Sequence, residues 1–254
     1  MRNTPIDQVD STPRAVLAIG TDYPEHHLLV THRHRRAQVL YAASGVMRVE
    51  TTHGTWTVPT RRAVLIPSEV DHRVEMAGVS TRSLYLEPGA VPWFPAQCRV
   101  VEVSPLLREL LLAAVDMPTM YDTRGRDGVL ADLILRELQT LAPAPFDLLL
   151  PRHVELRRLC QEFQGRPTIG STPQDWARRL RCSTRTLNRW FRSETGLTFQ
   201  QWRQRACVLH AVRALLSGAT VTAVAGDLGY DTPAAFTVMF QRETGASPSA
   251  FRAP

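Results

Sequence analysis

The sequence predicts an α+β protein with a β-rich N-terminal half, two helices after it, and an all-α C-terminal domain. Residues 30–86 are rich in valine, threonine and aromatic side chains, and glycines and prolines interrupt them at short intervals, which is typical of an antiparallel barrel or sandwich. The apolar positions then change to helical spacing, first over residues 105–115 and next over residues 128–141. After residue 151 we expect only helices.

The length of 254 residues fits two domains that each bury a core. Residues 142–151 contain three prolines, which punctuate the helical pattern. We therefore expect a first domain over residues 1–142, a linker over residues 143–152, and a helical domain over residues 153–254.

The charge of the chain is concentrated in its C-terminal part. All 30 basic residues are arginine; residues 1–151 hold 15 of them against 17 acidic residues, and residues 152–254 hold 15 against 7. This balance favours a nucleic-acid phosphate backbone as the partner. The longest apolar run covers residues 110–115 and is too short to span a bilayer, and the polar start of the chain does not resemble a secretory signal. We predict a cytoplasmic protein with no membrane segment.

An internal repeat is the most informative feature of the sequence. Five residues of the first copy reappear 49 positions later: Glu194, Thr195, Gly196, Trp202 and Arg203 correspond to Glu243, Thr244, Gly245, Phe251 and Arg252. Upstream, Trp176, Ala177 and Leu180 correspond to Val224, Ala225 and Leu228 at a spacing of 48. The second copy therefore has one extra residue between its upstream and downstream matches. Each copy is predicted as helix, turn, helix.

In the first copy, a helix over residues 174–180 leads to a second helix that begins after the predicted cap Ser183 and runs to about Glu194. Leu187, Trp190 and Phe191 have the spacing of a buried stripe. The open side then carries polar residues, namely Thr184, Arg185, Asn188, Arg189 and Arg192. Arginine and asparagine hydrogen-bond guanine and adenine edges in pairs, so we predict that this side contacts DNA.

The second copy is less polar. Gly229 is predicted to form the turn, Asp231 or Thr232 to cap the next helix, and Phe236 and Phe240 to pack inside. The open side of this helix carries Ala234, Thr237, Val238 and Gln241.

Residues 153–252 resemble the C-terminal DNA-binding domain of AraC/XylS family transcription regulators. The motifs that carry the resemblance are STRTLNRWF at residues 183–191, ETG at 194–196, VAGDLGYDTPAAF at 224–236 and GASP at 245–248. The resemblance implies seven helices, a connecting helix over residues 199–217, and two helices that read successive major-groove segments of double-stranded operator DNA.

The resemblance also assigns the reading residues. The base-reading positions of the family correspond to Arg185, Asn188 and Arg189 in the first unit, and to Ala234, Thr237 and Val238 in the second. The second set departs from the family pattern, in which polar or basic residues are frequent. It either contacts thymine methyl groups or only positions the domain.

The first half resembles the two short motifs of cupin barrels. The motif residues are HRHRRAQ at 32–38, followed by Gly45, and PSEVDH at 67–72. Metal-binding cupins hold one ion with HxH, a later glutamate and a further histidine, and the corresponding residues are His32, His34, Gln38 and His72. Alternate residues of a strand face one side, so His32 and His34 can share the interior, and neutral imidazoles suit zinc, nickel, copper or iron.

Two departures from the cupin pattern are that Gln38 replaces the carboxylate and that Glu69 stands where glycine is usual. We predict a divalent transition metal, zinc, nickel or iron, at the three histidines; the alternative is a pocket in which they only bond one another or an effector. Strand alternation also turns Arg36 inward, where it could pair with an anionic effector.

Together these features predict a non-enzymatic, sequence-specific transcription regulator that responds to a small molecule or metal. The family resemblance implies a homodimer, which forms through the leucine-rich helices of residues 106–138. One alternative is a cupin metalloenzyme, such as a dioxygenase or isomerase, fused to a DNA-binding domain. Gln38 and the lack of a further acid-base cluster count against it. Another alternative is an architectural DNA binder without sequence preference.

Overall fold

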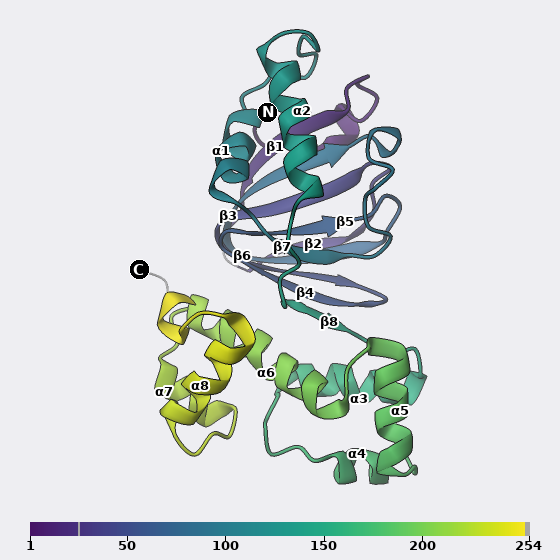
Figure 1. The fold of residues 1–254 in the computed structure, drawn as a ribbon, viewed down its shortest axis with the longest axis vertical. Helices are drawn as coiled ribbons and strands as arrows, with labels where there is room; N and C mark the ends of the chain where they lie inside the picture. Colours follow the sequence, from purple (N-terminus) through teal and green to yellow (C-terminus); the bar gives the residue numbers. More distant parts are fainter. Residues whose placement is uncertain (25, 252–254) are drawn as a thin grey trace. The chain divides into compact units, whose positions relative to one another are not determined.

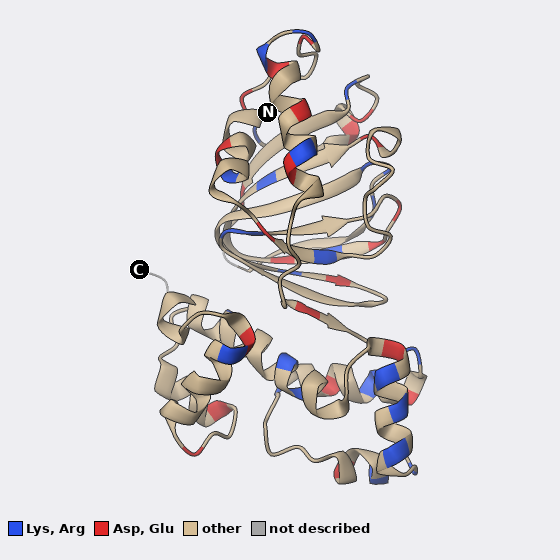
Figure 2. Cartoon of the chain, in the orientation of Figure 1, with Lys and Arg blue, Asp and Glu red and all other residues tan. Residues whose placement is uncertain are grey.

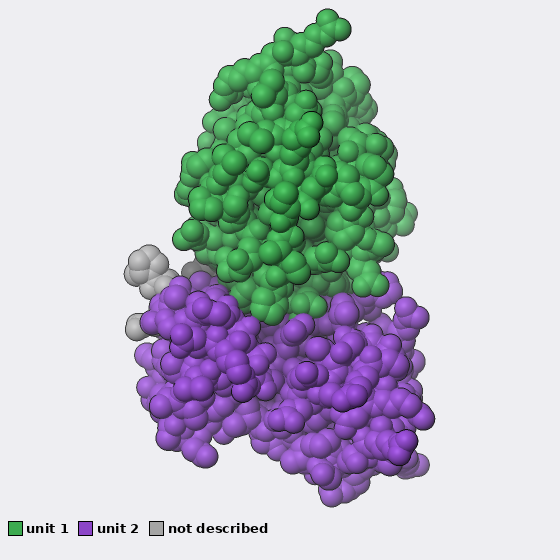
Figure 3. Space-filling view, in the orientation of Figure 1, with its two compact units in different colours: residues 1–51, 56–147 green, residues 52–55, 148–254 purple. Residues whose placement is uncertain are grey.

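The computed structural model describes residues 1–24 and 26–251 of the chain. It divides into two compact units (Figure 3). The first holds residues 1–51 and 56–147, and the second holds residues 52–55 and the chain from residue 148 onward.

The first unit is built on an antiparallel sheet, as the sequence predicts (Figure 1). Its strands are β1 (Val16–Asp22), β2 (His27–His32), β3 (Ala37–Thr51), β4 (Gly54–Pro59), β5 (Arg62–Ile66), β6 (His72–Leu86) and β7 (Arg99–Glu102). The main order is β1-β6-β3-β4, while β2 pairs with β6, and β5 pairs with both β3 and β7. The two longest strands, β3 and β6, pair with each other along most of their length and hold the others together.

A pair of glycines lets β3 and β6 cross closely where both strands bend. Gly45 has a φ of +72° and Gly78 a φ of +57°, and a Cβ added at Gly45 would lie 2.3 Å from the carbonyl oxygen of Gly78. The register of the two strands shifts on both sides of Ser44, so bulges bend the sheet at this point.

Helices α1 (Pro105–Ala114) and α2 (Arg126–Gln139) cover one face of the sheet (Figure 1). Val39 and Tyr41 of β3 belong to the same buried cluster as Leu111 of α1 and Ile134 of α2. Because side chains alternate along a strand, Gln38 lies on the opposite face of β3. The two helices thus lie within two residues of their predicted bounds.

Strand β1 begins well before residue 30, where the predicted β region starts. Its first five residues are all buried, so the strand shows no polar alternation that the sequence pattern could reveal. The proline-containing segment expected as a linker includes β8 (Asp147–Leu149), in which the boundary between the two units lies. Its apolar residues Phe146 and Leu148 are buried.

The second unit is helical. Its helices are α3 (Val154–Gly165), α4 (Pro173–Arg179), α5 (Thr184–Thr195), α6 (Phe199–Leu216), α7 (Val221–Asp227), α8 (Pro233–Thr244) and the 3-10 helix η3 (Pro248–Phe251). Over the described residues of this unit, these are the seven helices that the family resemblance implies. No described helix combines the length and the apolar character needed to cross a membrane.

Aromatic side chains form the core around the first helix pair. Trp176 of α4 contacts Phe191 of α5, with ring centroids 6.1 Å apart, and Phe199 of α6, at 5.0 Å. Trp202 of α6 completes the cluster and donates its indole N–H to the carbonyl of Leu149 at 2.8 Å. Helix α6 buries residues on all of its sides because it packs against both helix pairs (Figure 1).

Candidate functional site

The sequence repeat corresponds to a structural repeat. Helices α4 and α5 form one helix-turn-helix, and α7 and α8 form the other. Ser183 caps α5 by accepting a hydrogen bond from the amide of Thr186, and Thr232 caps α8 in the same way. The turn of the second copy is one residue longer, but both turns use the left-handed conformation at an equivalent position: Arg181 has a φ of +51°, and Gly229 has a φ of +82°.

The ends of the two reading helices are also equivalent. Gly196 and Gly245 follow α5 and α8 in the left-handed conformation, with φ of +75° and +74°. The preceding threonines, Thr195 and Thr244, each donate a hydroxyl hydrogen bond to the carbonyl four residues earlier. The repeated ETG sequence is therefore a helix-ending motif that only glycine completes without strain. Arg252, the last residue of the sequence repeat, lies outside the described residues.

Helix α5 presents a row of arginines on its outward side (Figure 2). Arg185, Arg189 and Arg192 are exposed and recur at helical spacing. Within residues 1–24 and 26–251, none of the three makes an ion pair or a side-chain hydrogen bond. Their guanidinium groups are thus available for an external partner.

One of the predicted base readers on α5, Asn188, makes hydrogen bonds inside the domain. The sequence places Asn188 among the base readers, but its amide donates to the carbonyl of Thr184 at 3.1 Å and accepts from the amide N–H of Phe199 at 3.2 Å. Asn188 therefore fixes α5 to the start of α6, with one donor and one acceptor of its amide engaged inside the domain. Thr184 itself is half-buried at the first turn of α5.

Trp190 is predicted to lie in the core, yet it is only half-buried and stacks on His153 with ring centroids 4.2 Å apart. On the next turn, the Glu194 carboxylate accepts hydrogen bonds from the amides of Arg152 and His153 at the start of α3. These contacts bind α5 to the N-terminus of α3, where a negative charge is favourable. The sequence contains no local signal of this pairing.

Helix α8 presents a different outward side. Ala234 and Val238 occupy the positions that Arg185 and Arg189 occupy on α5, and both are exposed. The hydroxyl of Thr237 donates to the carbonyl of Pro233 at 2.8 Å, so its polar group is turned back to its own helix. Phe236 and Phe240 are buried, as the sequence predicts.

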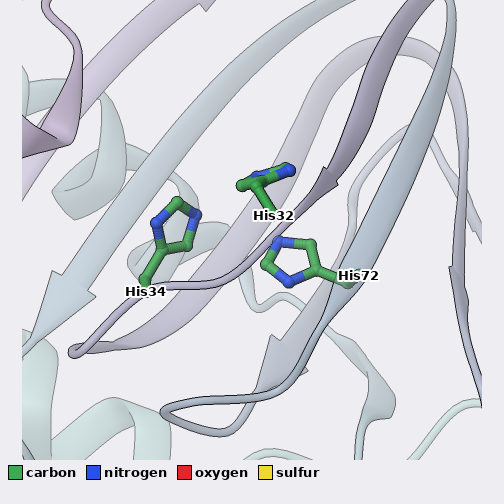
Figure 4. A group of neighbouring side chains, drawn as sticks. All are labelled: His32, His34 and His72. Atoms are coloured by element: carbon green, nitrogen blue, oxygen red, sulfur yellow. The ribbon is translucent and has the colours of Figure 1, made fainter.

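In the first unit, the structure brings His32, His34 and His72 together (Figure 4). Each can offer one ring nitrogen, and these nitrogens lie within 4.8 Å of one another. His32 ends β2, His72 begins β6, and His34 lies in the loop after β2. A shift in strand register between Leu29 and His32 sets the direction of His32, so a bulge, and not simple alternation, brings it to the cluster.

Hydrogen bonds select which ring nitrogens of the cluster are free. Nδ1 of His32 bonds the carbonyl of Val30 at 2.7 Å, and Nδ1 of His72 bonds the carbonyl of Val70 at 2.9 Å. A carbonyl only accepts, so Nδ1 carries the proton in both rings and Nε2 keeps its lone pair. Nε2 of His72 and of His34 is buried without a partner among the described residues.

Burial keeps two of these rings neutral. It lowers the pKa of His72 to about 4, and burial together with the neighbouring imidazoles lowers the pKa of His34 to about 4. Neutral imidazoles with free lone pairs are the form that ligates a transition metal. The donor set therefore fits a divalent ion such as zinc, nickel or iron.

Gln38 lies behind this cluster. Its amide group donates to the Tyr85 hydroxyl at 3.2 Å and to Ser83 at 3.4 Å, and the Tyr85 ring lies 5.1 Å from that of His34. The contact of Gln38 with the cluster thus passes through Tyr85, a residue that sequence reasoning missed. It could be found only from the pairing of Gln38 with Tyr85 across β3 and β6.

Arg36 is turned inward and only 1% exposed, but the chain itself supplies its partners. Its guanidinium forms ion pairs with Asp10 and Glu87, both at 3.1 Å, and donates to the carbonyls of Thr12 and Arg14. The sequence assigns this guanidinium to an anionic effector; in the structure the N-terminal segment occupies it instead. A buried guanidinium needs such partners, and residues far away in the sequence provide them.

Comparison with known proteins assigns both units. Residues 15–138 match the family described as AraC-like ligand binding domain, and residues 176–254 match the family described as Helix-turn-helix domain. The HTH-type transcriptional regulator NimR of Escherichia coli K12 is 32% identical over 221 residues, which cover 87% of this chain and 81% of NimR.

Solved structures also match. The structure of ToxT from Vibrio cholerae matches 94% of this chain and 98% of its own, at 9% identity and a TM-score of 0.39. The DNA-binding domain of AdpA, in complex with a target DNA, is 32% identical, with 41% of this chain and 90% of that domain covered and a TM-score of 0.35. From the family matches and the similarity to NimR, the chain belongs to the AraC/XylS family of DNA-binding transcription regulators and consists of a ligand-binding domain followed by a double helix-turn-helix domain.

Proposed function

We propose that this regulator recognises a specific operator in double-stranded DNA with α5 and α8, and that a small molecule or metal in its first unit adjusts that binding. The outward row of Arg185, Arg189 and Arg192 is the observation that supports the proposal most, because three guanidinium groups without a partner in the described chain match guanine edges and phosphates. Arg185 and Arg189 lie nearest the helix start and read bases. Thr184 and Arg192 contact the backbone phosphates.

The test of this function is to recover the fragments of genomic DNA that the full-length protein binds. Recovered fragments are expected to share a common sequence near promoters, and binding to one of them should resist an excess of random DNA at physiological salt. Fragments without a shared sequence would instead support an architectural DNA binder.

We propose that His32, His34 and His72 hold one divalent transition metal, and that Gln38 supports the site through Tyr85. The Nε2 atoms of His34 and His72, which have no partner among the described residues, support this assignment. A bound ion with three neutral ligands supplies a positive charge that attracts an oxygen-bearing effector. The ring positions of His32 and His72 are already fixed by the carbonyls of Val30 and Val70. The role of the site is binding without catalysis, and it acts by shifting a conformational population.

Protein purified without an affinity tag is expected to contain about one zinc, nickel or iron ion per chain, because three neutral imidazoles at one point form a specific site. His34→Ala should lose this metal, whereas the matched change His26→Ala, outside the cluster, should keep it. Elemental analysis makes the measurement. Metal-free wild-type protein that takes up none of the three added ions would show that the histidines only line a pocket.

We also propose a homodimer that forms through α1 and α2. Leu106 of α1 is 50% exposed, and Val129 and Leu133 lie one turn apart on the outer side of α2, where Val129 is 65% exposed. Apolar side chains on adjacent helices are stabilised when a second copy covers them.

Leu133→Asp is therefore expected to convert a dimer into a monomer, since it places a charge in an apolar interface. Leu28→Asp, at an exposed leucine of β2, is the matched control and should leave the dimer intact. Light scattering at micromolar concentration distinguishes the monomer from the dimer. A monomeric wild-type chain would contradict the proposed dimer.

A further inference from the structure

The two reading helices offer opposite chemistry at equivalent positions. A spacing of 49 residues relates Arg185 to Ala234 and Arg189 to Val238, and all four are exposed on the outward side of their helix. Val238 is 70% exposed. The same face of the motif therefore carries guanidinium groups in the first helix-turn-helix and methyl groups in the second.

On the first two turns of α8, all of whose residues the structure describes, the two threonine hydroxyls already have partners within the helix. Thr237 donates its hydroxyl proton to the carbonyl of Pro233, and the capping hydroxyl of Thr232 accepts from the amide of Ala235. The other exposed residues on these turns are all apolar, namely Pro233, Ala234, Ala235 and Val238. The next outward polar residue, Gln241, lies on the third turn, farther from the helix start that enters the groove.

The two helix-turn-helix copies also differ in charge. Residues 173–195 hold six arginines and two acidic residues, whereas residues 221–251 hold one arginine and three acidic residues. That one arginine, Arg242, pairs with Glu243 at 3.4 Å. The second helix-turn-helix therefore gains little from phosphate attraction, and its contribution to recognition has to come from short-range contact.

In the major groove, the only apolar group on a base edge is the 5-methyl group of thymine. The match to the helix-turn-helix family covers α8 as well as α5, so α8 belongs to a DNA-binding unit and is not merely an uncovered helix face. We infer that α8 recognises thymine methyl groups through Ala234 and Val238, so that the operator consists of one segment read by arginines and one read by methyl contact. This inference rests on the proposed operator recognition.

The test replaces thymine by deoxyuridine, one position at a time, in a genomic fragment that the full-length protein binds selectively. This change removes only the methyl group. Replacing a thymine that α8 contacts should then lower the affinity about fourfold, which is the effect of losing one buried carbon group. Replacing a thymine outside that segment should change the affinity little.

The variant Val238→Ala identifies the thymines that Val238 contacts. Thymines touched by Val238 should lose their sensitivity to deoxyuridine in this variant. Val238→Thr, which keeps the shape but replaces one methyl group by a hydroxyl, should weaken the preference for thymine. Val154→Ala is the matched control, because Val154 is an exposed valine on α3 and not on a reading helix. It should reproduce the wild-type pattern.

The outcomes separate this inference from the proposed function. Selective binding with the same deoxyuridine sensitivity in wild type and Val238→Ala would overturn methyl reading and leave operator recognition in place. Selective binding with no sensitive thymine would do the same. A wild-type protein that binds no DNA fragment selectively would contradict both methyl reading and operator recognition.

Discussion

Replacing Arg185 and Arg189 together by alanine is expected to remove selective DNA binding while the fold stays intact. Both side chains are exposed and have no partner among the described residues, so their loss leaves the core unchanged. A guanidinium that bonds a guanine edge contributes about 1 to 3 kcal/mol of discrimination, so the double variant should lose about 2 to 6 kcal/mol on the operator if the two contacts are independent. Affinity for random DNA should fall much less.

The matched control is Arg166→Ala, which removes an exposed arginine outside α5. It should change operator and random binding by the same small amount. Equal losses on the two DNAs in the double variant would show that Arg185 and Arg189 contact phosphates and do not read bases.

Phe240→Ala is expected to destabilise the second helix-turn-helix by about 3 to 5 kcal/mol, because it leaves a cavity in a closely packed core. Phe240 is fully buried and contacts Phe236 and Phe251, with ring centroids at 5.5 and 5.3 Å. Denaturant unfolding of the full chain, followed by tryptophan fluorescence and circular dichroism, measures the change. Operator binding should weaken as well, since Phe240 holds the outward side of α8 in place.

Val238→Ala is the surface control on the same helix and should alter the free energy of unfolding by no more than about 0.5 kcal/mol. Because the chain has two compact units, their transitions have to be resolved separately. An unchanged transition of the helical unit in Phe240→Ala would show that this ring is not part of its core.

Local sequence rules were sufficient to predict the helical repeat. Ser183 and Thr232 cap their helices, and Gly229 supplies the left-handed turn, because these features depend on residues within one or two turns. The periodic apolar stripes also separated the buried Phe191 from the exposed Arg189.

Side chains with distant partners were not predictable in this way. The pattern gave the side of α5 on which Asn188 lies, but not its hydrogen bond to the amide of Phe199 eleven residues later. Likewise, alternation turned Arg36 inward without showing that Asp10 reaches it. A strand or helix period predicts direction, whereas the partner depends on the tertiary fold.

The histidine cluster was predictable from the sequence only in part. The motifs selected His32, His34 and His72, and the structure brings all three together. The prediction from simple strand alternation did not include the bulge before His32 or the position of His34 in a loop. The residue types were therefore predictable from the sequence, and the local backbone was not.

The most direct test of operator recognition is the ratio of two affinities of the full-length protein, for a recovered genomic fragment and for the same fragment with its sequence shuffled. Both are measured at physiological salt, because phosphate attraction alone raises both equally. Sequence-specific recognition predicts a ratio of about 10³ or more. A ratio near one would contradict it and identify the chain as a DNA binder without sequence preference.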